Sequence, residues 1–375
     1  MVLIAPTRPT EIPLVDLALQ HREIAADIVP TLLRLMADGR FIGGSEVSDF
    51  ESAFAAFSHR LGCVGVGNGT DAVELMLRAA GIGPGDDVVV PANTFVATVA
   101  AVVRAGAHPV FADCDPVHHL IDPESVSESI TPRTRAIMAV HLYGQMAPME
   151  RLAAVAEAHG ALLFEDAAQA HGATRYGRTP GTWGRAAATS FYPGKNLGAY
   201  GDGGAVTTDN AELASRVRAL RNHGGNGRYD HRMIGWNSRL DTLQAAVLLA
   251  KLPHLQEWND QRVQAARTYD KLLAGHDGIR LPNVLSGNEH VWHLYVVRVA
   301  ERDRVLGELN EAGIQAGVHY PVPVHLLPGF EAGERGRFPN AELMADEILS
   351  LPVYPGITPE QVERVAETLL RSVDA

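Results

Sequence analysis

The chain has 375 residues, of which 46% are hydrophobic and 20% charged, and its formal net charge is −12 at pH 7. This length exceeds what one hydrophobic core usually organises, so we expect one large and one small domain. The acidic balance argues against a nucleic-acid binder or an anionic-membrane binder, and no run approaches the ~18 apolar residues of a membrane span. The two cysteines, Cys63 and Cys114, lie beside apolar runs, and no signal-peptide pattern precedes Asp16, which indicates a cytoplasmic protein.

Short strand-like runs alternate with helical stretches between residues 63 and 209. Several runs are apolar on both faces, as in Val88–Val90, which is typical of a mostly parallel sheet covered by helices. The expected strands are Cys63–Val66, Asp87–Val90, Pro109–Ala112, Ala136–Leu142, Leu162–Glu165, Ala187–Tyr192 and Gly204–Thr207. The expected helices are Thr70–Ala80, Phe95–Ala105, Met149–His159 and Ala211–His223.

The pattern changes after the sheet. A long helix is expected over Thr242–Asn259, and Pro253 should break it near Leu252. An alternating strand and two helices then predict a smaller α+β unit, and these elements are Trp292–Val299, Arg302–Ala312 and Thr358–Ser372. We therefore predict a large domain over residues 1–250 and a small domain over residues 251–375.

Lysine usage singles out one residue. The chain has only three lysines, Lys195, Lys251 and Lys271, and relies on arginine for the rest of its positive charge. Lys195 lies in a glycine-rich loop, whereas the other two lie in helix-like, charged stretches. Arginine cannot replace a lysine whose neutral amine attacks a carbonyl, because a guanidinium stays protonated. The pattern favours Schiff-base chemistry at Lys195, with a solvated surface charge as the alternative.

Three motifs at strand ends supply partners for such a lysine. Gly69 and Thr70 open a helix, where free backbone N–H groups can bind an anion, or where the polar residues simply cap the helix. Phe95 can stack on a flat ring or serve as core. Asp166 can face a pyridinium nitrogen or cap the next segment. Pyridoxal phosphate would use all of these features together with Lys195.

From about Phe41 to Gly356, the chain resembles the DegT/DnrJ/EryC1/StrS family of pyridoxal-phosphate sugar aminotransferases. The motifs that carry this resemblance are Gly67–Ala72, Pro91–Phe95, His141–Gly144, Glu165–Gln169, Ser190–Phe191 with Lys195, and Gly235–Asp241. The resemblance implies fold type I, the aspartate-aminotransferase fold, with a large, mostly parallel α/β domain and a small α+β domain.

The roles of the family's site residues transfer onto matching positions of this chain. Lys195 matches the lysine that binds the cofactor covalently, and Asp166 matches the partner of the pyridine nitrogen. The other implied cofactor contacts are Gly69, Thr70 and Ser190 at the phosphate with Asp71 in the same motif, Phe95 on the ring, Gln169 beside the phenolic oxygen, and Asn237 from the partner subunit. A residue donated by the partner implies a homodimer with shared active sites. Relatives with histidine in place of Lys195 are dehydratases, so the lysine implies transamination.

Two further segments, Gly317–His325 and Asn237–Arg239, resemble 3-aminotransferases that act on dTDP-3-keto-6-deoxyhexoses. The implied reaction moves an amino group from glutamate or glutamine to C3 of the nucleotide sugar. The implied substrate contacts are His319, Tyr320, His325 and Arg239. The two histidines fit a structural role equally well, and Arg239 fits a dimer contact.

Other functions remain open at this point. A 4-keto nucleotide sugar or a keto-cyclitol is an alternative substrate, and a regulatory protein that binds pyridoxal phosphate is an alternative class. Binding alone needs neither Lys195 nor Asp166, so their joint presence favours an enzyme. The glycine-rich loop Gly224–Arg228 is either a lid on the substrate side or a plain connection. We expect no metal site.

Overall fold

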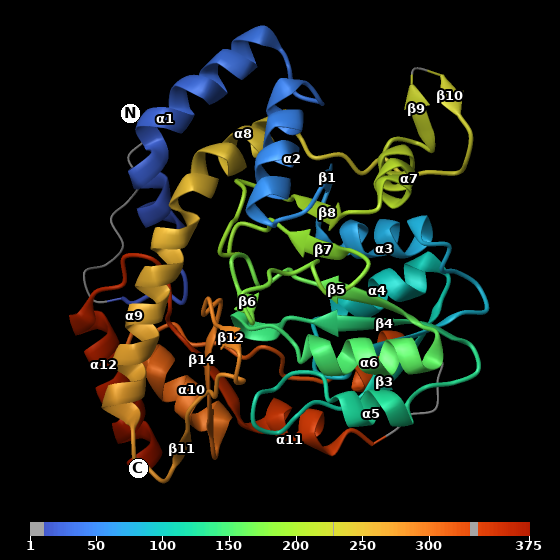
Figure 1. The fold of residues 1–375 in the computed structure, drawn as a ribbon. Coiled ribbons are helices and arrows are strands. Elements are labelled where there is room, and N and C mark those ends of the chain that lie inside the picture. Colours follow the sequence, from blue (N-terminus) through green and yellow to red (C-terminus); the bar gives the residue numbers. More distant parts are fainter. Residues whose placement is uncertain (1–10, 228, 331–336) are drawn as a thin grey trace.

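The computed structural model describes residues 11–227, 229–330 and 337–375, so Arg228 lies outside the described residues (Figure 1). A seven-stranded sheet with the order β1-β8-β7-β5-β4-β2-β3 forms the centre of the larger part of the chain. Its strands are β1 (Gly62–Val66), β2 (Asp87–Pro91), β3 (His108–Ala112), β4 (Thr134–Val140), β5 (Leu162–Asp166), β7 (Ala187–Ser190) and β8 (Gly204–Thr208). β8 runs opposite to its two neighbours, β1 and β7, and the other pairs in the sheet are parallel. All seven predicted strands therefore belong to one mostly parallel sheet, although β4 and β7 end two residues earlier than expected.

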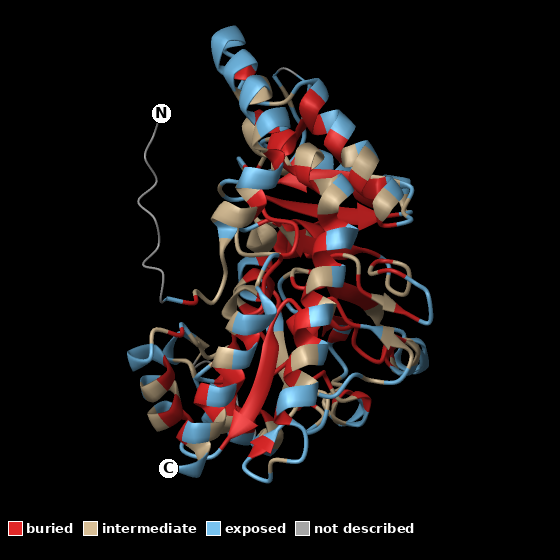
Figure 2. Ribbon diagram, turned by 90° about the vertical axis from the view of Figure 1, so that its left-hand side faces the viewer, coloured by how far each residue is buried: buried red, intermediate tan, exposed pale blue. Residues whose placement is uncertain are grey.

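Helices cover both faces of this sheet, which explains the continuous apolar runs. Val88 and Val90 belong to the hydrophobic cluster under α3, α4 and α7, whereas Val89 between them belongs to the cluster under α6. Successive side chains of a strand point to opposite faces, so both faces here must be apolar. The helices are α3 (Gly69–Ala79), α4 (Val96–Ala105), α5 (Pro123–Glu128), α6 (Met149–His159) and α7 (Ala211–Arg221). Figure 2 shows the buried strands between helices whose outer faces are exposed.

Two N-terminal helices, α1 (Leu17–Asp38) and α2 (Ser45–Phe57), were not predicted from the sequence. In α1, apolar residues at helical spacing, such as Ile24 and Ile28, pack against the segment that contains Trp258. That segment begins with α8 (Thr242–Lys251), passes through a 3-10 turn and continues as α9 (Leu255–Leu273). The predicted break at Pro253 is confirmed, because this proline lies in the turn. The helix resumes, however, and extends well beyond the predicted end at Asn259.

The C-terminal part contains a small antiparallel sheet with the order β11-β13-β14. Its strands are β11 (Ile279–Arg280), β13 (Tyr295–Val299) and β14 (Ile348–Leu351), and its helices are α10 (Arg302–Glu311), α11 (Pro339–Glu347) and α12 (Pro359–Asp374). The predicted alternation of buried and exposed residues in a strand over Trp292–Val299 is wrong. The strand begins at Tyr295, and every one of its residues is buried. The N-terminal segment joins this core through Ile12, which bridges to Ile314. The division at residue 250 stays a prediction.

Two short antiparallel strand pairs complete the fold. β6 (Thr174–Arg175) pairs with β12 (Asn288–Glu289), and β9 (Gly225–Gly227) pairs with β10 (Asp230–His231). The second pair projects from the body of the molecule beyond α7 (Figure 1). No helix among the described residues is long and apolar enough to cross a membrane.

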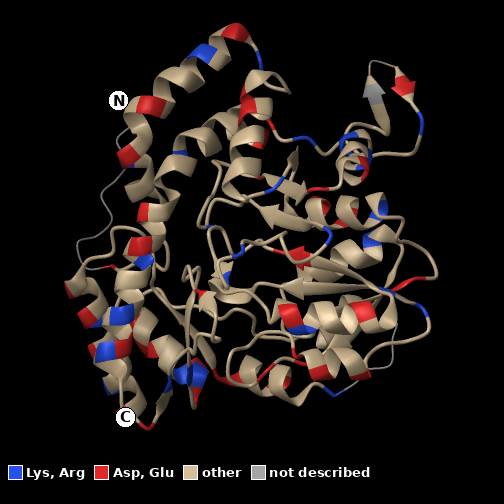
Figure 3. Ribbon diagram, in the orientation of Figure 1, with Lys and Arg blue, Asp and Glu red and all other residues tan. Residues whose placement is uncertain are grey.

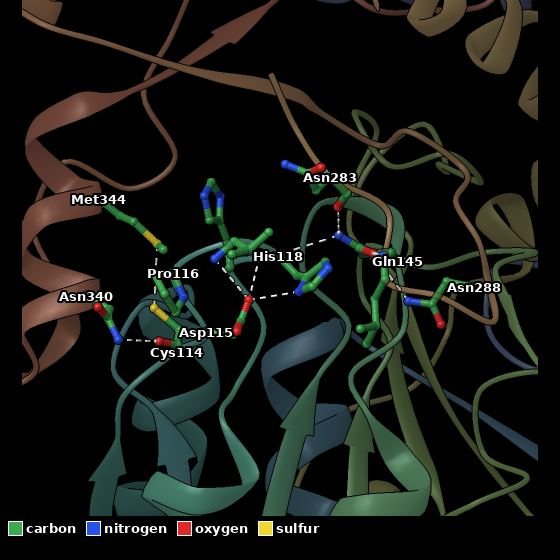
Figure 4. Close-up of polar contacts among 12 residues, drawn as sticks. Cys114, Asp115, Pro116, His118, Gln145, Asn283, Asn288, Asn340 and Met344 are labelled. Carbon is green, nitrogen blue, oxygen red and sulfur yellow. Dashed lines mark hydrogen bonds and ion pairs between the residues drawn. The ribbon is translucent and has the colours of Figure 1, made fainter. Parts of the chain in front are cut away.

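Polar contacts hold the C-terminal part against the ends of the central strands (Figure 4). The side-chain amide of Asn340 donates to the carbonyl of Cys114 at 2.9 Å. The buried carboxylate of Asp113 accepts the backbone N–H groups of Asn340 and Ala341 at 3.0 and 2.9 Å. These N–H groups belong to the first turn of α11 and have no partner inside the helix. A carboxylate from the loop after β3 therefore caps a helix of the C-terminal part.

We expect Asp113→Ala to lower the free energy of unfolding by about 1–3 kcal/mol, because two N–H groups at the start of α11 lose their acceptor. Urea titration followed by circular dichroism measures this value. Asp113→Asn keeps one acceptor oxygen and should lose less. A change below ~0.5 kcal/mol in Asp113→Ala, the range of an ordinary surface substitution, would show that the cap contributes nothing.

Candidate active site

A cavity of about 520 Å³ opens at the carboxyl ends of the central strands. This volume lies within the range of small-molecule sites, and strand ends are where open α/β sheets bind ligands. The sheet side contributes, among others, Gly69, Thr70, Phe95, Thr98, Asp166, Gln169, Ser190 and Lys195. The C-terminal part contributes His293, Leu294, His319 and Tyr320, so the cavity lies between the two parts of the chain.

Lys195 lies in the loop after β7 and lines this cavity. Burial lowers the pKa of the Lys195 amine to about 8, and the negative charge of Asp166 opposes part of that change. A substantial fraction of the amine is therefore neutral near pH 8, as a nucleophile or a base requires.

Lys251 does not lie in the charged surroundings that the sequence suggested. Its side chain is 2% exposed, its Nζ donates to the carbonyl of Gly198 at 2.7 Å, and burial also lowers its pKa to about 8. A lowered pKa is thus not what distinguishes Lys195 from Lys251. The distinguishing property is its access to the cavity, which Lys251 lacks.

Asp166 ends β5, where Figure 3 shows an acidic tip among central strands that carry little charge. Its Oδ2 accepts from the hydroxyl of Thr98 at 2.7 Å, and its Oδ1 accepts from the backbone N–H of Ala168 at 3.1 Å. Thr98 in turn contacts Thr94 at 2.9 Å. Thr98 was not predicted as a site residue from the sequence; it lies in the first turn of α4, and Thr94 lies just before that helix. The carboxylate is thus held in place from two sides.

The start of α3 forms one end of the cavity. Asn68 caps the helix, because its Oδ1 accepts from the N–H of Asp71 at 2.8 Å. The capping alternative is therefore present, and Gly69, Thr70 and Ser190 line the cavity as well. A Cβ at Gly69 would lie 2.5 Å from the Cβ of Ser190, so only glycine permits this close approach. The exposed N–H groups of a helix start suit a phosphate.

Asp71 does not line the cavity, so the geometry does not support the predicted direct contact between Asp71 and the cofactor. Its Oδ2 accepts from the hydroxyl of Ser238 at 2.7 Å, and its Oδ1 accepts from Arg104 at 2.9 Å. Ser238 directly follows Asn237, so the carboxylate joins the start of α3 to the segment that carries Asn237. We therefore interpret Asp71 as a positioning residue.

Aromatic and amide side chains form the opposite wall. The Phe95 ring is partly exposed and lies 5.0 Å from the ring of Tyr320. The amide of Gln169 accepts from the N–H of Tyr143 at 2.6 Å and donates to the hydroxyl of Tyr320 at 3.0 Å. His319 lies beside Tyr320 in the lining, and its Nδ1 contacts the hydroxyl of Ser350 at 2.8 Å. His319 and Tyr320 thus reach the cavity, as the substrate prediction requires.

Three predicted residues lie elsewhere. His325 is buried against Phe111 and Phe338, and its Nε2 contacts Glu342 at 3.2 Å, so the geometry favours the structural alternative. Arg239 lines a separate pocket of about 390 Å³, which Arg218 and Arg221 also line. Asn237 is exposed and does not line the cavity of its own chain.

Residues 22–370 match the DegT/DnrJ/EryC1/StrS aminotransferase family. The chain belongs to this family. It is 46% identical to the dTDP-3-amino-3,4,6-trideoxy-alpha-D-glucose transaminase of Streptomyces venezuelae, over 96% of this chain and 95% of the relative. It is also 46% identical to a "pleiotropic regulatory protein" of Geobacillus stearothermophilus, over 96% of this chain and 97% of the relative.

A solved structure of DesV from S. venezuelae, in complex with a ketimine intermediate, matches the fold with a TM-score of 0.94. It shares 45% sequence identity, and the match covers 97% of this chain and 99% of that one. The predicted fold type I is therefore confirmed, and the protein is a sugar aminotransferase that depends on pyridoxal phosphate. The cavity fits this cofactor, since it combines an amine, a carboxylate, a helix start and an aromatic ring.

We expect Lys195 in the cofactor-free protein to react with a small acylating reagent with a midpoint near pH 8, rather than near the ordinary 10.5. The neutral amine is the reactive form, so labelling should rise as the pH rises through this value. Peptide mapping by mass spectrometry assigns the label, and Lys271, exposed on α9, serves as the internal reference. Asp166→Asn removes the charge that favours the ammonium and should move the midpoint to lower pH. A midpoint near 10.5 would contradict the argument.

Proposed function

We propose that the enzyme transfers an amino group from glutamate or glutamine to C3 of a dTDP-linked 3-keto-6-deoxyhexose. One observation carries the proposal: Lys195 and Asp166 share a cavity with His319 and Tyr320, from the segment that resembles 3-aminotransferases. The name of the Streptomyces relative supports both the dTDP group and the amine at C3.

Pyridoxal phosphate, when bound, would supply an electron-accepting ring and would carry the amino group between the two substrates on the carbon attached to that ring. Lys195 is the residue that moves a proton, because its amine accepts one when neutral and returns one when charged. Asp166 offers a fixed negative charge to a protonated ring nitrogen, and Thr98 and Ala168 keep that charge in place. The start of α3 and Ser190 would bind the phosphate. Phe95 would cover one face of the ring.

Two alternatives compete with this proposal. A 4-keto nucleotide sugar or a keto-cyclitol would need the same cofactor residues, so Lys195 and Asp166 do not separate these substrates. A regulatory role is suggested by the name of the Geobacillus relative. Regulation by binding requires neither a cavity-facing amine with a lowered pKa nor a clamped carboxylate, so the geometry favours catalysis.

We also propose that the active unit is a homodimer with shared sites. Asn237 is exposed and lies outside its own cavity, so it is available to reach the cavity of a second copy. Large apolar side chains are exposed on α1 and on both sides of the Asn237 segment, where Ile42 bridges to Asp241. They include Leu33, Met36, Phe41, Ile42, Met233 and Ile234. In an isologous dimer, this apolar surface would be buried on both subunits.

The substrate proposal predicts that the pyridoxamine form of the enzyme aminates dTDP-3-keto-6-deoxyglucose and places the new nitrogen at C3. The experiment offers the 3-keto and 4-keto dTDP-6-deoxyhexoses separately and locates the nitrogen by NMR. A keto-cyclitol without a nucleotide is the matched control for the contribution of the dTDP group. Nitrogen found only at C4, or turnover of the cyclitol alone, would reject the proposed substrate and leave the cofactor assignment intact.

The dimer proposal predicts complementation between two inactive variants. Lys195→Ala lacks the reactive amine, and Asn237→Asp places a negative charge where the partner's phosphate would lie. Mixed dimers should recover up to about half of the activity per dimer, because one of their two sites has both native residues. Differently tagged copies, purified in tandem, isolate these dimers. No recovery in purified mixed dimers would reject shared sites.

A further inference from the structure

His293 is a cavity residue to which neither the sequence nor the comparisons assign a role. It lies just before β13 and lines the cavity with Lys195. Its Nδ1 lies 3.1 Å from Oδ1 of Asn196, the residue that directly follows Lys195. This contact joins the C-terminal part to the lysine loop. Among the described residues, Nδ1 is the only ring nitrogen of His293 with a hydrogen-bond partner.

The surrounding contacts determine which nitrogen of His293 carries the proton. The amide nitrogen of Asn196 donates to the carbonyl of Val291 at 2.9 Å and to Oδ1 of Asn259 at 2.8 Å. A carbonyl oxygen can only accept, so the orientation of the Asn196 amide is fixed and its oxygen must be an acceptor. His293 therefore donates through Nδ1–H. In the neutral ring, Nε2 then carries a lone pair and no proton.

The surroundings also keep the ring neutral. Burial is the main cause that lowers the pKa of His293 well below its ordinary value, and the nearby positive charges of Lys195 and Arg262 lower it further. Asn196 is 1% exposed, so the contact at Nδ1 faces the protein interior. The nitrogen on the other side of the ring, Nε2, is the one that can meet a molecule in the cavity. Such a nitrogen accepts a hydrogen bond and cannot donate one.

We propose that His293 Nε2 accepts a hydrogen bond from a sugar hydroxyl on a carbon next to the carbonyl carbon that receives the amine. This inference rests on the proposed function. Lys195 must act at the reacting carbon, and His293 is tied to the residue beside it, so the neighbouring hydroxyls are the donors within reach. An amino-acid donor such as glutamate has no hydroxyl. His293 would therefore serve the sugar half of the reaction and not the amino-acid half.

Two substitutions distinguish the roles of the two ring nitrogens of His293. His293→Asn keeps an N–H group near the position of Nδ1 and removes the acceptor at Nε2. His293→Gln places an amide oxygen near Nε2 and lacks the donor to Asn196. Stopped-flow absorbance measures each half-reaction of the holoenzyme alone, with glutamate for the first and dTDP-3-keto-6-deoxyglucose for the second. Calorimetry with the same nucleotide sugar gives the binding constant without turnover.

In His293→Asn, we expect the sugar half-reaction to slow by about ten- to a hundred-fold, the scale of one lost hydrogen bond in a buried site. The glutamate half-reaction should change less than about three-fold, and His293→Gln should retain more of the sugar half-reaction than His293→Asn. Substrate analogues that lack the C2 or the C4 hydroxyl identify the donor. His293→Asn should not slow the reaction of the analogue that lacks the donor hydroxyl any further, because that hydrogen bond is already absent.

Equal losses in both half-reactions of His293→Asn would overturn the proposal and assign His293 to the support of the lysine loop. An unchanged sugar half-reaction in that variant would overturn it as well. The proposed function is tested separately, because the wild-type enzyme must first aminate the nucleotide sugar. If His293→Asn fails to fold, His293→Gln with the deoxy analogues still tests the contact. Because His293→Gln keeps an acceptor near Nε2, the two analogues should differ in the rate of the sugar half-reaction as they do with the wild-type enzyme.

Discussion

The removal of water from around the Lys195 amine is the constraint on which the rest of the site depends. An ordinary lysine is almost fully protonated at neutral pH and can neither attack a carbonyl nor accept a proton. Here the C-terminal part covers the ends of the parallel strands and buries the amine, while Asp166 prevents the pKa from falling further. The same packing brings His293, His319 and Tyr320 to the cavity. The desolvation of the amine and the substrate contacts that we propose therefore have one structural origin.

A buried polar network supports this arrangement beneath the lysine. Asn196 contacts His293, Val291 and Asn259, and the amide of Asn259 donates to the carbonyl of His171 at 2.9 Å. Buried polar groups are costly unless they are paired, so such a network specifies one arrangement of the loop. Lys251 adds a second support where it donates to the carbonyl of Gly198. The lysine loop is thus held by α9 and the segment before β13 on one hand, and by α8 on the other.

The pocket lined by arginines is separate from the cavity lined by Lys195, and this separation bears on where an acidic protein can bind phosphorylated molecules. The net charge is −12, yet Arg218, Arg221 and Arg239 gather around one pocket apart from Lys195. Arg221 also pairs with Glu51, so part of this positive charge is neutralised within the chain. Local geometry, rather than net charge, therefore decides where an anion can bind.

The sequence by itself determined the seven strands of the central sheet, the helices α3, α4, α6 and α7, and the break at Pro253, because these depend on local apolar periodicity and on the chemistry of proline. It also singled out Lys195 and Asp166, and the family motifs indicated the cofactor. It missed α1, α2, α5 and α11, although α1 has apolar residues at helical spacing. It misjudged Lys251, because burial by distant segments leaves no local pattern. Only the tertiary structure decided that Thr98 holds Asp166, that His325 and Asp71 lie outside the cavity, and that His293 lies in it. Those contacts join residues from separate segments of the chain: Thr98 of α4 meets Asp166 at the end of β5, whereas the position of His293 depends on how the C-terminal part packs against the strand ends.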